Sequence, residues 1–185
     1  MKPKEPDPRL RTPLEGSGHR LWDPQAVIAA PLQLHQTPVL PEWVDYNGHL
    51  RDAYYLLLFS LATDALMDQL GLDEAGRAAT GHSLYTLECH LNFVQEVKLG
   101  QLVEVRTQIL GHDSKRLHLN HSLHLSGEAP MLAASEQMLL NVATAMARAA
   151  PFAEAVQSRV EALARAHQAL PVPRFAGRAI SLARS

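Results

Sequence analysis

The segment that most constrains this chain is the helical pattern of residues 52–70, which is apolar on most of its sides. Its polar residues fall into one narrow stripe at intervals of four: Ser60, Asp64 and Asp68. Asp52 stands where a side chain caps the N-terminus, and Gly71 follows the last turn as a left-handed stop. A helix with so little polar surface must be surrounded by protein, so we expect the rest of the domain to wrap around it.

The segments after this helix alternate in the manner of β-strands. Residues 84–97, 103–109 and 117–125 place apolar side chains at every second position and are separated by short turns. Alternation with one polar face is typical of antiparallel strands, so the three segments predict a meander. Residues 32–39 are expected to add a short first strand.

The C-terminal part of the chain is less uniform. Residues 131–147 are ambiguous, because their alanines suit a helix while residues 137–142 alternate as in a strand, and propensity alone favours the helix. A final amphipathic helix is clearer, since Pro151 stands at its start and apolar residues then recur every three or four positions. The last dozen residues are expected to form a tail.

The composition is that of one soluble domain. Of 185 residues, 46% are hydrophobic and 19% charged, and a net charge of −2 without a basic stripe argues against a nucleic-acid partner. We expect an extended arm over residues 1–30, the domain over 31–148, and a closing helix with its tail over 149–185. The end of the arm is expected to pack on the domain through four apolar side chains: Leu21, Trp22, Val27 and Ile28.

The sequence also predicts a cytoplasmic location. Cys89 is the single cysteine, so no internal disulfide forms, which fits a reducing compartment, and its place on the apolar side of its strand favours an inert core thiol. Residues 1–13 carry charges and prolines without the apolar run of a secretory signal. The most apolar segment, residues 53–67, is too short to span a bilayer, so no membrane partner is expected.

The most unusual chemistry lies in residues 43–50, which bring an acid, an amide, an imidazole and two aromatic rings to the start of the helix. Free backbone N–H groups there stabilise developing negative charge, as an acyl-transfer oxyanion requires. Asp45 suits a general base or nucleophile, His49 suits a group that orients a carbonyl, and Gly48 allows close approach to the backbone. The alternative is that these residues are only caps and turn formers, and the residues alone favour it.

The run Asp45-Tyr46-Asn47-Gly48-His49-Leu50, with Tyr55 ten residues after the aspartate, resembles the opening signature of hotdog-fold acyl-CoA thioesterases of the 4-hydroxybenzoyl-CoA thioesterase-like superfamily. Further blocks resemble the thioesterases associated with carnitine dehydrogenase, whose inferred activity is betainyl-CoA hydrolysis: residues 43–49, 85–90, 96–100, 115–119 and 136–140. The resemblance spans about residues 32–170. It implies an α+β hotdog fold, in which a five-stranded antiparallel sheet wraps a long central helix and residues 131–144 form the last strand.

The resemblance also implies roles for residues of the loop. Asp45 takes the position of the catalytic carboxylate, and Asn47 and His49 support the loop and the site. The backbone near His49 and Leu50 polarises the thioester carbonyl. The reaction would be hydrolysis of a small acyl-CoA to the free acid and CoA without a cofactor, at sites formed between the subunits of a homodimer or a dimer of dimers.

A cationic acyl group such as betainyl requires aromatic faces and a nearby negative charge. Glu88, on the polar face of its strand with His90, is the predicted charge, although a solvated strand residue is an equally good reading. The predicted aromatic cage consists of four residues: Trp43, Tyr46, Tyr54 and Tyr85. Substrate contacts are also expected from three residues of the signature: Gly48, Leu50 and Tyr55.

Ten histidines raise the question of a metal site. His118 and His124 share one face of their strand while His121 points to the opposite, apolar face, so the three do not converge on one ion and no metal is expected. Candidates for contacts to CoA phosphates are three basic residues, for which ordinary surface charge is an equal alternative: Lys98, Lys115 and Arg116.

Two other functions fit parts of the pattern. A hotdog enoyl-CoA hydratase also joins an Asp and a His near a helix start, but it spaces them by five with a proline between, whereas Asp45 and His49 are four apart across Gly48. A non-catalytic acyl-CoA-binding hotdog protein is the alternative from another class. The helix start also departs from the wider thioesterase pattern, because Arg51 and Asp52 stand in place of an Asn-Asn pair.

Overall fold

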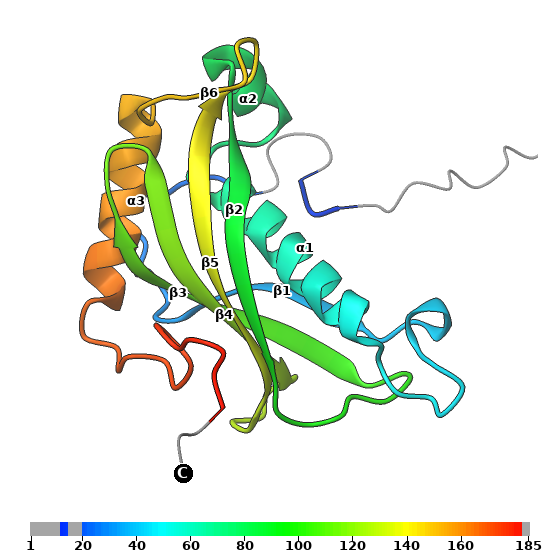
Figure 1. Cartoon of the computed structure of the whole chain (residues 1–185). Coiled ribbons are helices and arrows are strands. Elements are labelled where there is room, and N and C mark those ends of the chain that lie inside the picture. Colours follow the sequence, from blue (N-terminus) through cyan, green and yellow to red (C-terminus); the bar gives the residue numbers. More distant parts are fainter. Residues whose placement is uncertain (1–11, 15–19, 183–185) are drawn as a thin grey trace, which may run out of the picture.

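The structure is a computed structural model of the chain and describes residues 12–14 and 20–182. Its strands form one antiparallel sheet in the order β1-β3-β4-β5-β2, and the short β6 pairs with β5 (Figure 1). The elements, in chain order, are β1 (Leu32–Pro38), the 3-10 helix η1 (Pro41–Trp43), α1 (Asp52–Leu70), α2 (Glu74–Thr80), β2 (His82–Phe93), β3 (Leu102–His112), β4 (Arg116–Leu125), β5 (Met131–Ala143), β6 (Arg148–Ala149) and α3 (Glu154–His167).

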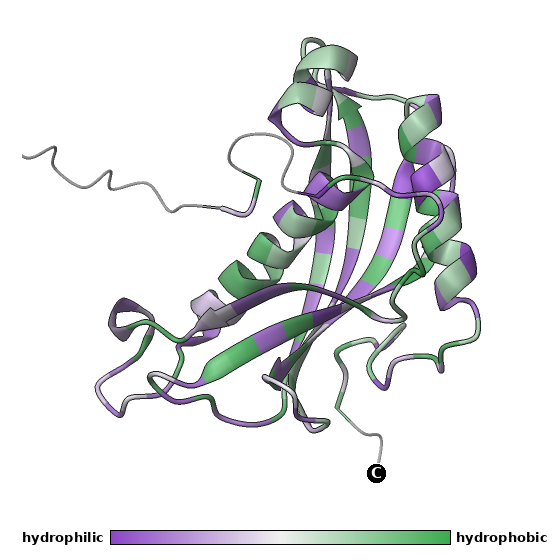
Figure 2. Ribbon diagram, turned by 180° about the vertical axis from the view of Figure 1, so that it is seen from behind, coloured by the Kyte–Doolittle hydropathy of each residue, from purple (hydrophilic) through white to green (hydrophobic). Residues whose placement is uncertain are grey.

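The sheet curls around α1, as the apolar helix pattern predicted. Leu58, Phe59, Leu66 and Leu70 of this helix are fully buried against the inner face of the sheet. Figure 2 shows the alternation of hydrophobic and hydrophilic bands along the strands, which gives the sheet an apolar inner face. The predicted α+β hotdog architecture, with a long helix wrapped by an antiparallel sheet, is confirmed.

The core has two parts along α1. Around the second half of the helix, α3 and the residue Phe152 just before it add an apolar stripe to the core: Phe152, Val156, Val160 and Leu163. Around the first half, the core is built from η1, the start of α1 and strands β3 to β5, and it includes Trp43, Leu50 and Tyr55. The predicted catalytic loop is therefore anchored directly in the second of these clusters.

The sequence predicted the C-terminal end of α1 correctly but not its N-terminal end. Gly71 ends the helix in the left-handed region with φ 79°, as predicted. The prediction that Asp52 caps the N-terminus is wrong, because Arg51 occupies the cap position without a side-chain cap and Asp52 is the first helical residue. The Asp52 carboxylate accepts a hydrogen bond only from the neighbouring Ala53 N–H, at 2.8 Å.

β5 resolves the ambiguity of residues 131–147. The segment forms a strand over Met131–Ala143, as the resemblance implied and against its helix propensity. It pairs with β4 on one side and β2 on the other, so hydrogen bonds along both edges and burial of its inner face outweigh the preference of its alanines.

β2 differs from its predicted pattern. The strand ends at Phe93 rather than near residue 97, and it forms one edge of the sheet with a register shift between Thr86 and Glu88. Three of its large apolar side chains are about half exposed: Tyr85 48%, Leu87 57% and Phe93 55%. The alternation along β2 therefore does not produce one fully buried face.

The described part of the N-terminal arm packs on the end of the domain. Trp22 and Ile28 contact the core, whereas the predicted contacts of Leu21 and Val27 are wrong, because these side chains are exposed. Arg20 forms an ion pair with Asp68 at 3.1 Å, so the arm matches the C-terminal end of the polar stripe of α1, whereas Ser60 at its other end is exposed. Among the described residues, no helix has the length and apolarity needed to cross a membrane.

The C-terminal segment lies against the outer face of the sheet, the face that points away from α1. Phe175 is buried, and the backbone N–H of Gly177 donates to Glu136 Oε2 on β5 at 2.8 Å. Residues 175–177 of the predicted tail are therefore held on the sheet by specific contacts, whereas Ile180 and Leu182 beyond them are exposed.

Candidate active site

Residues 44–50 form a tight hairpin that delivers the chain into α1. Val44 and Leu50 bridge its base, and two backbone hydrogen bonds between Asp45 and residues across the turn close it, from Asp45 N to His49 O at 2.9 Å and from Gly48 N to Asp45 O at 3.0 Å. Gly48 has φ 77°, a conformation that glycine adopts without strain. Backbone hydrogen bonds within the single chain thus define the conformation of the loop.

The Asp45 side chain organises this hairpin. Its Oδ1 accepts hydrogen bonds from the backbone N–H of Asn47 at 2.8 Å and of His49 at 3.1 Å. These bonds, of which that from His49 has the larger effect, hold the pKa of the Asp45 carboxyl below its ordinary value. Its Oδ2 has no hydrogen-bond partner among residues 12–14 and 20–182, which leaves one oxygen of the carboxylate for chemistry.

The hairpin docks on residues 96–99, which follow β2. The N–H of Leu50 donates to Val97 O at 2.7 Å, and the N–H of Leu99 donates to Gly48 O at 3.0 Å. This pairing brings the Glu96 carboxylate to 3.3 Å from His49 Nε2. Glu96 therefore joins the site although no role was predicted for it.

The start of α1 offers a backbone N–H, but not at the predicted residues. The N–H groups of His49 and Leu50 are already donated, to Asp45 Oδ1 and Val97 O, so neither is available to a substrate carbonyl. Within the described chain, the N–H of Asp52 has no hydrogen-bond acceptor. The unused donor at the positive end of the helix is thus that of Asp52.

A cavity of about 310 Å³ opens at this helix start. Its walls come from the hairpin, the first turn of α1 and the end of β2: Leu50, Asp52, Tyr55, Phe93, Val94, Gln95 and Glu96. The rings of Tyr55 and Phe93 meet edge to face with centroids 5.2 Å apart, and the Tyr55 hydroxyl donates to Gln95 O at 3.4 Å. Of the predicted site residues, Leu50 and Tyr55 line this cavity.

The predicted aromatic cage is not assembled within one chain. Trp43 is buried, and its ring stacks on that of Tyr54 with the centroids 6.1 Å apart, whereas Tyr46 is 94% exposed at the hairpin tip. Tyr85 lies eight residues before Phe93, roughly 26 Å along β2. The predicted cage is wrong for the single chain. The four aromatic residues were chosen because they lie near the signature in the sequence, but their rings do not lie close together in the fold.

Glu88 and His90 point away from α1. Cys89 between them pairs with Gln137, whose side chain contacts Thr63 of α1, so its two neighbours face the outer side of the sheet. There they line a separate cavity with His118 and Glu136, and His118 Nε2 lies 2.7 Å from Glu136 Oε1. This position does not support the predicted contact of Glu88 and His90 with an acyl group at the helix start.

The other candidate residues are dispersed. His121 is buried on the inner face while His118 and His124 lie on the outer face, as predicted. Burial raises the pKa of the Cys89 thiol, in keeping with the predicted inert cysteine. Of the basic residues, Lys98 lies beside the hairpin, where its backbone forms a β-bridge with that of His49. Arg116 lies at the opposite end of the sheet, and its Nη2 forms an ion pair with Asp113 Oδ2 at 2.7 Å.

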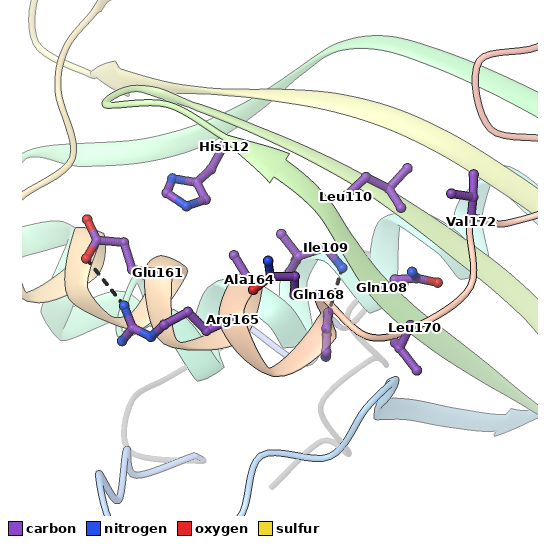
Figure 3. A pocket seen from close by; sticks show the side chains of 11 residues that line it. Gln108, Ile109, Leu110, His112, Glu161, Ala164, Arg165, Gln168, Leu170 and Val172 are labelled. Atoms are coloured by element: carbon purple, nitrogen blue, oxygen red, sulfur yellow. Dashed lines mark hydrogen bonds and ion pairs between the residues drawn. The ribbon is translucent and has the colours of Figure 1, made fainter.

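A larger cavity of about 490 Å³ lies between α3 and β3 (Figure 3). Its polar walls include Glu161 and Arg165, which pair at 3.9 Å, and His112. None of the residues of the predicted site lines it, and it lacks an unused helix-start amide. The smaller cavity at α1 is therefore the candidate active site.

Comparisons with known proteins identify the family of this chain. A family model described as the thioesterase-like superfamily matches residues 39–160, which include the hairpin, α1 and the sheet from β2 to β5. The chain belongs to the thioesterase-like superfamily. The predicted family, and with it the class of thioester hydrolase, is confirmed.

Two relatives of this thioesterase carry a more specific name. The betainyl-CoA thioesterase of Pseudomonas aeruginosa is 66% identical over 151 residues, which cover 82% of this chain and 95% of that one. The L-carnitine dehydrogenase/betainyl-CoA thioesterase of Agrobacterium fabrum is 42% identical over 154 residues, which cover 83% of this chain and 31% of that longer protein.

Solved structures agree. A Pseudomonas putida KT2440 protein assigned as a thioesterase superposes with a TM-score of 0.73 and 51% identity over 83% of this thioesterase and 98% of that chain. A hypothetical protein of Staphylococcus aureus, solved in complex with CoA, gives a TM-score of 0.76 and 25% identity over 85% of this chain and 99% of that one.

Proposed function

We propose that this thioesterase hydrolyses betainyl-CoA to betaine and CoA at the N-terminus of α1. The observation that carries the proposal is the unused N–H of Asp52, a residue that lines a cavity of about 310 Å³, in a chain 66% identical to a betainyl-CoA thioesterase. A cavity of this volume is at the small end of ligand sites and suits a short acyl group.

The proposed mechanism uses the helix start as the electrophilic element. The Asp52 N–H and the helix dipole stabilise negative charge that develops on the thioester oxygen. The ionised Asp45 carboxylate either takes a proton from an attacking water or attacks the carbonyl itself and is then released by water. In both routes the C–S bond breaks, oxygen from water ends in betaine, and CoA leaves as the thiol.

We further propose that the working enzyme is a cytoplasmic homodimer joined along β2. The edge of β2 that faces away from β5 has no strand partner among the described residues. Half-exposed apolar side chains lie along it and beside the cavity: Leu56, Tyr85, Leu87, Phe93 and Val94. A second copy on this edge would cover the open cavity and bring further groups to it, CoA phosphate contacts included. A CoA-bound structural neighbour supports an acyl-CoA ligand.

The test is release of free thiol from betainyl-, acetyl- and hexanoyl-CoA by the wild type and by Asp45→Asn. An asparagine keeps an Oδ1 that accepts the two hairpin hydrogen bonds but cannot act as a base or anionic nucleophile, so kcat is expected to fall by about 100-fold or more with the fold intact. Full activity of Asp45→Asn would refute the role of Asp45.

Absence of thiol release by the wild type from all three thioesters would refute hydrolysis. Binding of the same thioesters without turnover would then favour the non-catalytic alternative. Hydration of an enoyl-CoA without thiol release would favour the hydratase.

A further inference from the structure

The cavity at the start of α1 carries negative charge and no positive side chain. Asp52 and Glu96 are its two ionisable carboxylates, and the other wall residues are uncharged or aromatic. His49 lies outside the walls and faces Glu96 at 3.3 Å. A helix N-terminus already favours anions, so two carboxylates at this point change the kind of ligand that the cavity accepts.

The apolar part of the cavity suits a cation with methyl groups. Phe93 is 55% exposed and its ring packs on Tyr55, so aromatic surface is presented to the cavity. Quaternary ammonium groups bind to aromatic faces with a nearby negative charge and form no hydrogen bonds that must be satisfied. Aromatic surface and carboxylates thus occur together in this cavity.

The chemistry of the substrate requires this arrangement close to the helix start. In a betainyl thioester the ammonium nitrogen is separated from the carbonyl carbon by one methylene group. When the carbonyl oxygen meets the Asp52 N–H, the cation must therefore lie in the same cavity. There the helix dipole would repel it unless negative side chains compensate.

We propose that Asp52 and Glu96 are the residues that make this thioesterase selective for a quaternary ammonium acyl group. This inference rests on the proposed site of hydrolysis. The Asp52 and Glu96 carboxylates balance the positive helix end, and Phe93 and Tyr55 supply the aromatic surface. The selecting charge is then not Glu88, which faces the outer side of the sheet.

The test compares betainyl-CoA with 3,3-dimethylbutanoyl-CoA, its uncharged isostere with carbon in place of nitrogen. We expect the wild type to have the higher kcat/KM on betainyl-CoA. The ratio of the two kcat/KM values should fall about tenfold in Glu96→Gln and in Asp52→Asn, because each removes one charge with little change in shape. Glu74→Gln, which neutralises an exposed carboxylate on α2, is the matched control and should leave the ratio unchanged.

The outcomes separate this inference from the proposed function. Equal kcat/KM of the wild type on both thioesters, or an unchanged ratio in both Glu96→Gln and Asp52→Asn, overturns the selectivity proposal while hydrolysis stands. No hydrolysis of either thioester by the wild type overturns the proposed function and the inference with it. The rate on the neutral isostere also reports whether each variant is folded.

Discussion

Single polar side chains determine the shape of the site, and Asp45 is the main one. One of its oxygens holds the hairpin through the N–H groups of Asn47 and His49, while the other is unpartnered in the described structure. The two readings of Asp45 from sequence, turn former and catalytic carboxylate, therefore do not compete. The hydrogen bonds that shape the turn also stabilise the ionised carboxylate and so lower its pKa.

His121 shows how the core under α1 accommodates polar groups. Its ring is fully buried, stacks on Phe59 at 5.9 Å, and lies within hydrogen-bond distance of Thr63 Oγ1 at 3.0 Å and Thr107 Oγ1 at 2.9 Å. Burial lowers the pKa of His121 from 6.5 to about 3. The ring is therefore neutral in the folded protein at every pH at which the enzyme would work.

This buried ring predicts a pH dependence of stability. Below pH 6.5 His121 becomes protonated in the unfolded chain but stays neutral in the folded protein. The free energy of unfolding therefore decreases as the pH falls from 6.5 towards 3. The slope from this one group is about 1.4 kcal/mol per pH unit. Urea unfolding at several pH values should show a shallower dependence in His121→Gln, whose side chain does not titrate.

His167 and other histidines with lowered pKa remain in both proteins, so the difference between wild type and variant isolates His121. Identical slopes for the two proteins would contradict the assignment.

The sequence pointed to Asp45 and His49 of the candidate site but not to Glu96 or the free amide of Asp52. The first pair lies in one compact motif with a recognisable spacing. Glu96 reaches His49 only because the hairpin docks on the segment after β2, a long-range pairing that no local pattern encodes. The block of residues 96–100 was part of the family resemblance, and that is the only sequence signal for it.

At the scale of elements, α1 was predictable at its C-terminal end and not at its N-terminal end. Gly71 signals a left-handed stop by its residue type alone. The start of α1 is instead set by the hairpin pairing of Val44 with Leu50, so the helix begins without a side-chain cap and Asp52 falls one residue inside. β5 illustrates the same limit, since its two strand neighbours rather than its alanines decide its conformation.

Gly71 and Gly81 provide a matched test of how α1 is connected to its surroundings. Both have positive φ, 79° and 67°, but a Cβ at residue 71 would lie 2.1 Å from Nη1 of Arg159, while a Cβ at residue 81 would meet nothing within 4 Å. Gly81→Ala should cost about 1 kcal/mol of backbone strain. Gly71→Ala should cost about 2 kcal/mol, because it also displaces the Arg159 guanidinium from its place over Trp22.

Urea unfolding of both variants measures the difference. Equal losses would show that the contact of Arg159 with the arm contributes nothing to stability.

At the scale of the whole molecule, the half-exposed edge of β2 is the main feature that a single chain leaves open. Leu87→Lys places a charge on this edge and should convert a homodimer to single chains in light scattering, with loss of thiol release because the cavity is no longer covered. Leu102→Lys, at an exposed leucine on β3, is the control and should change neither. A dimer that persists in Leu87→Lys would place the interface elsewhere.

In the proposed mechanism, the start of α1 polarises the carbonyl of a cationic acyl-CoA. The most direct measurement is a crystal structure with a betainyl-CoA analogue in which a methylene group replaces the thioester sulfur. We predict that its carbonyl oxygen lies within about 3 Å of the Asp52 backbone nitrogen and its ammonium group between Phe93 and Glu96. An acyl group bound on the outer face beside Glu88, or in the cavity between α3 and β3, would contradict the account.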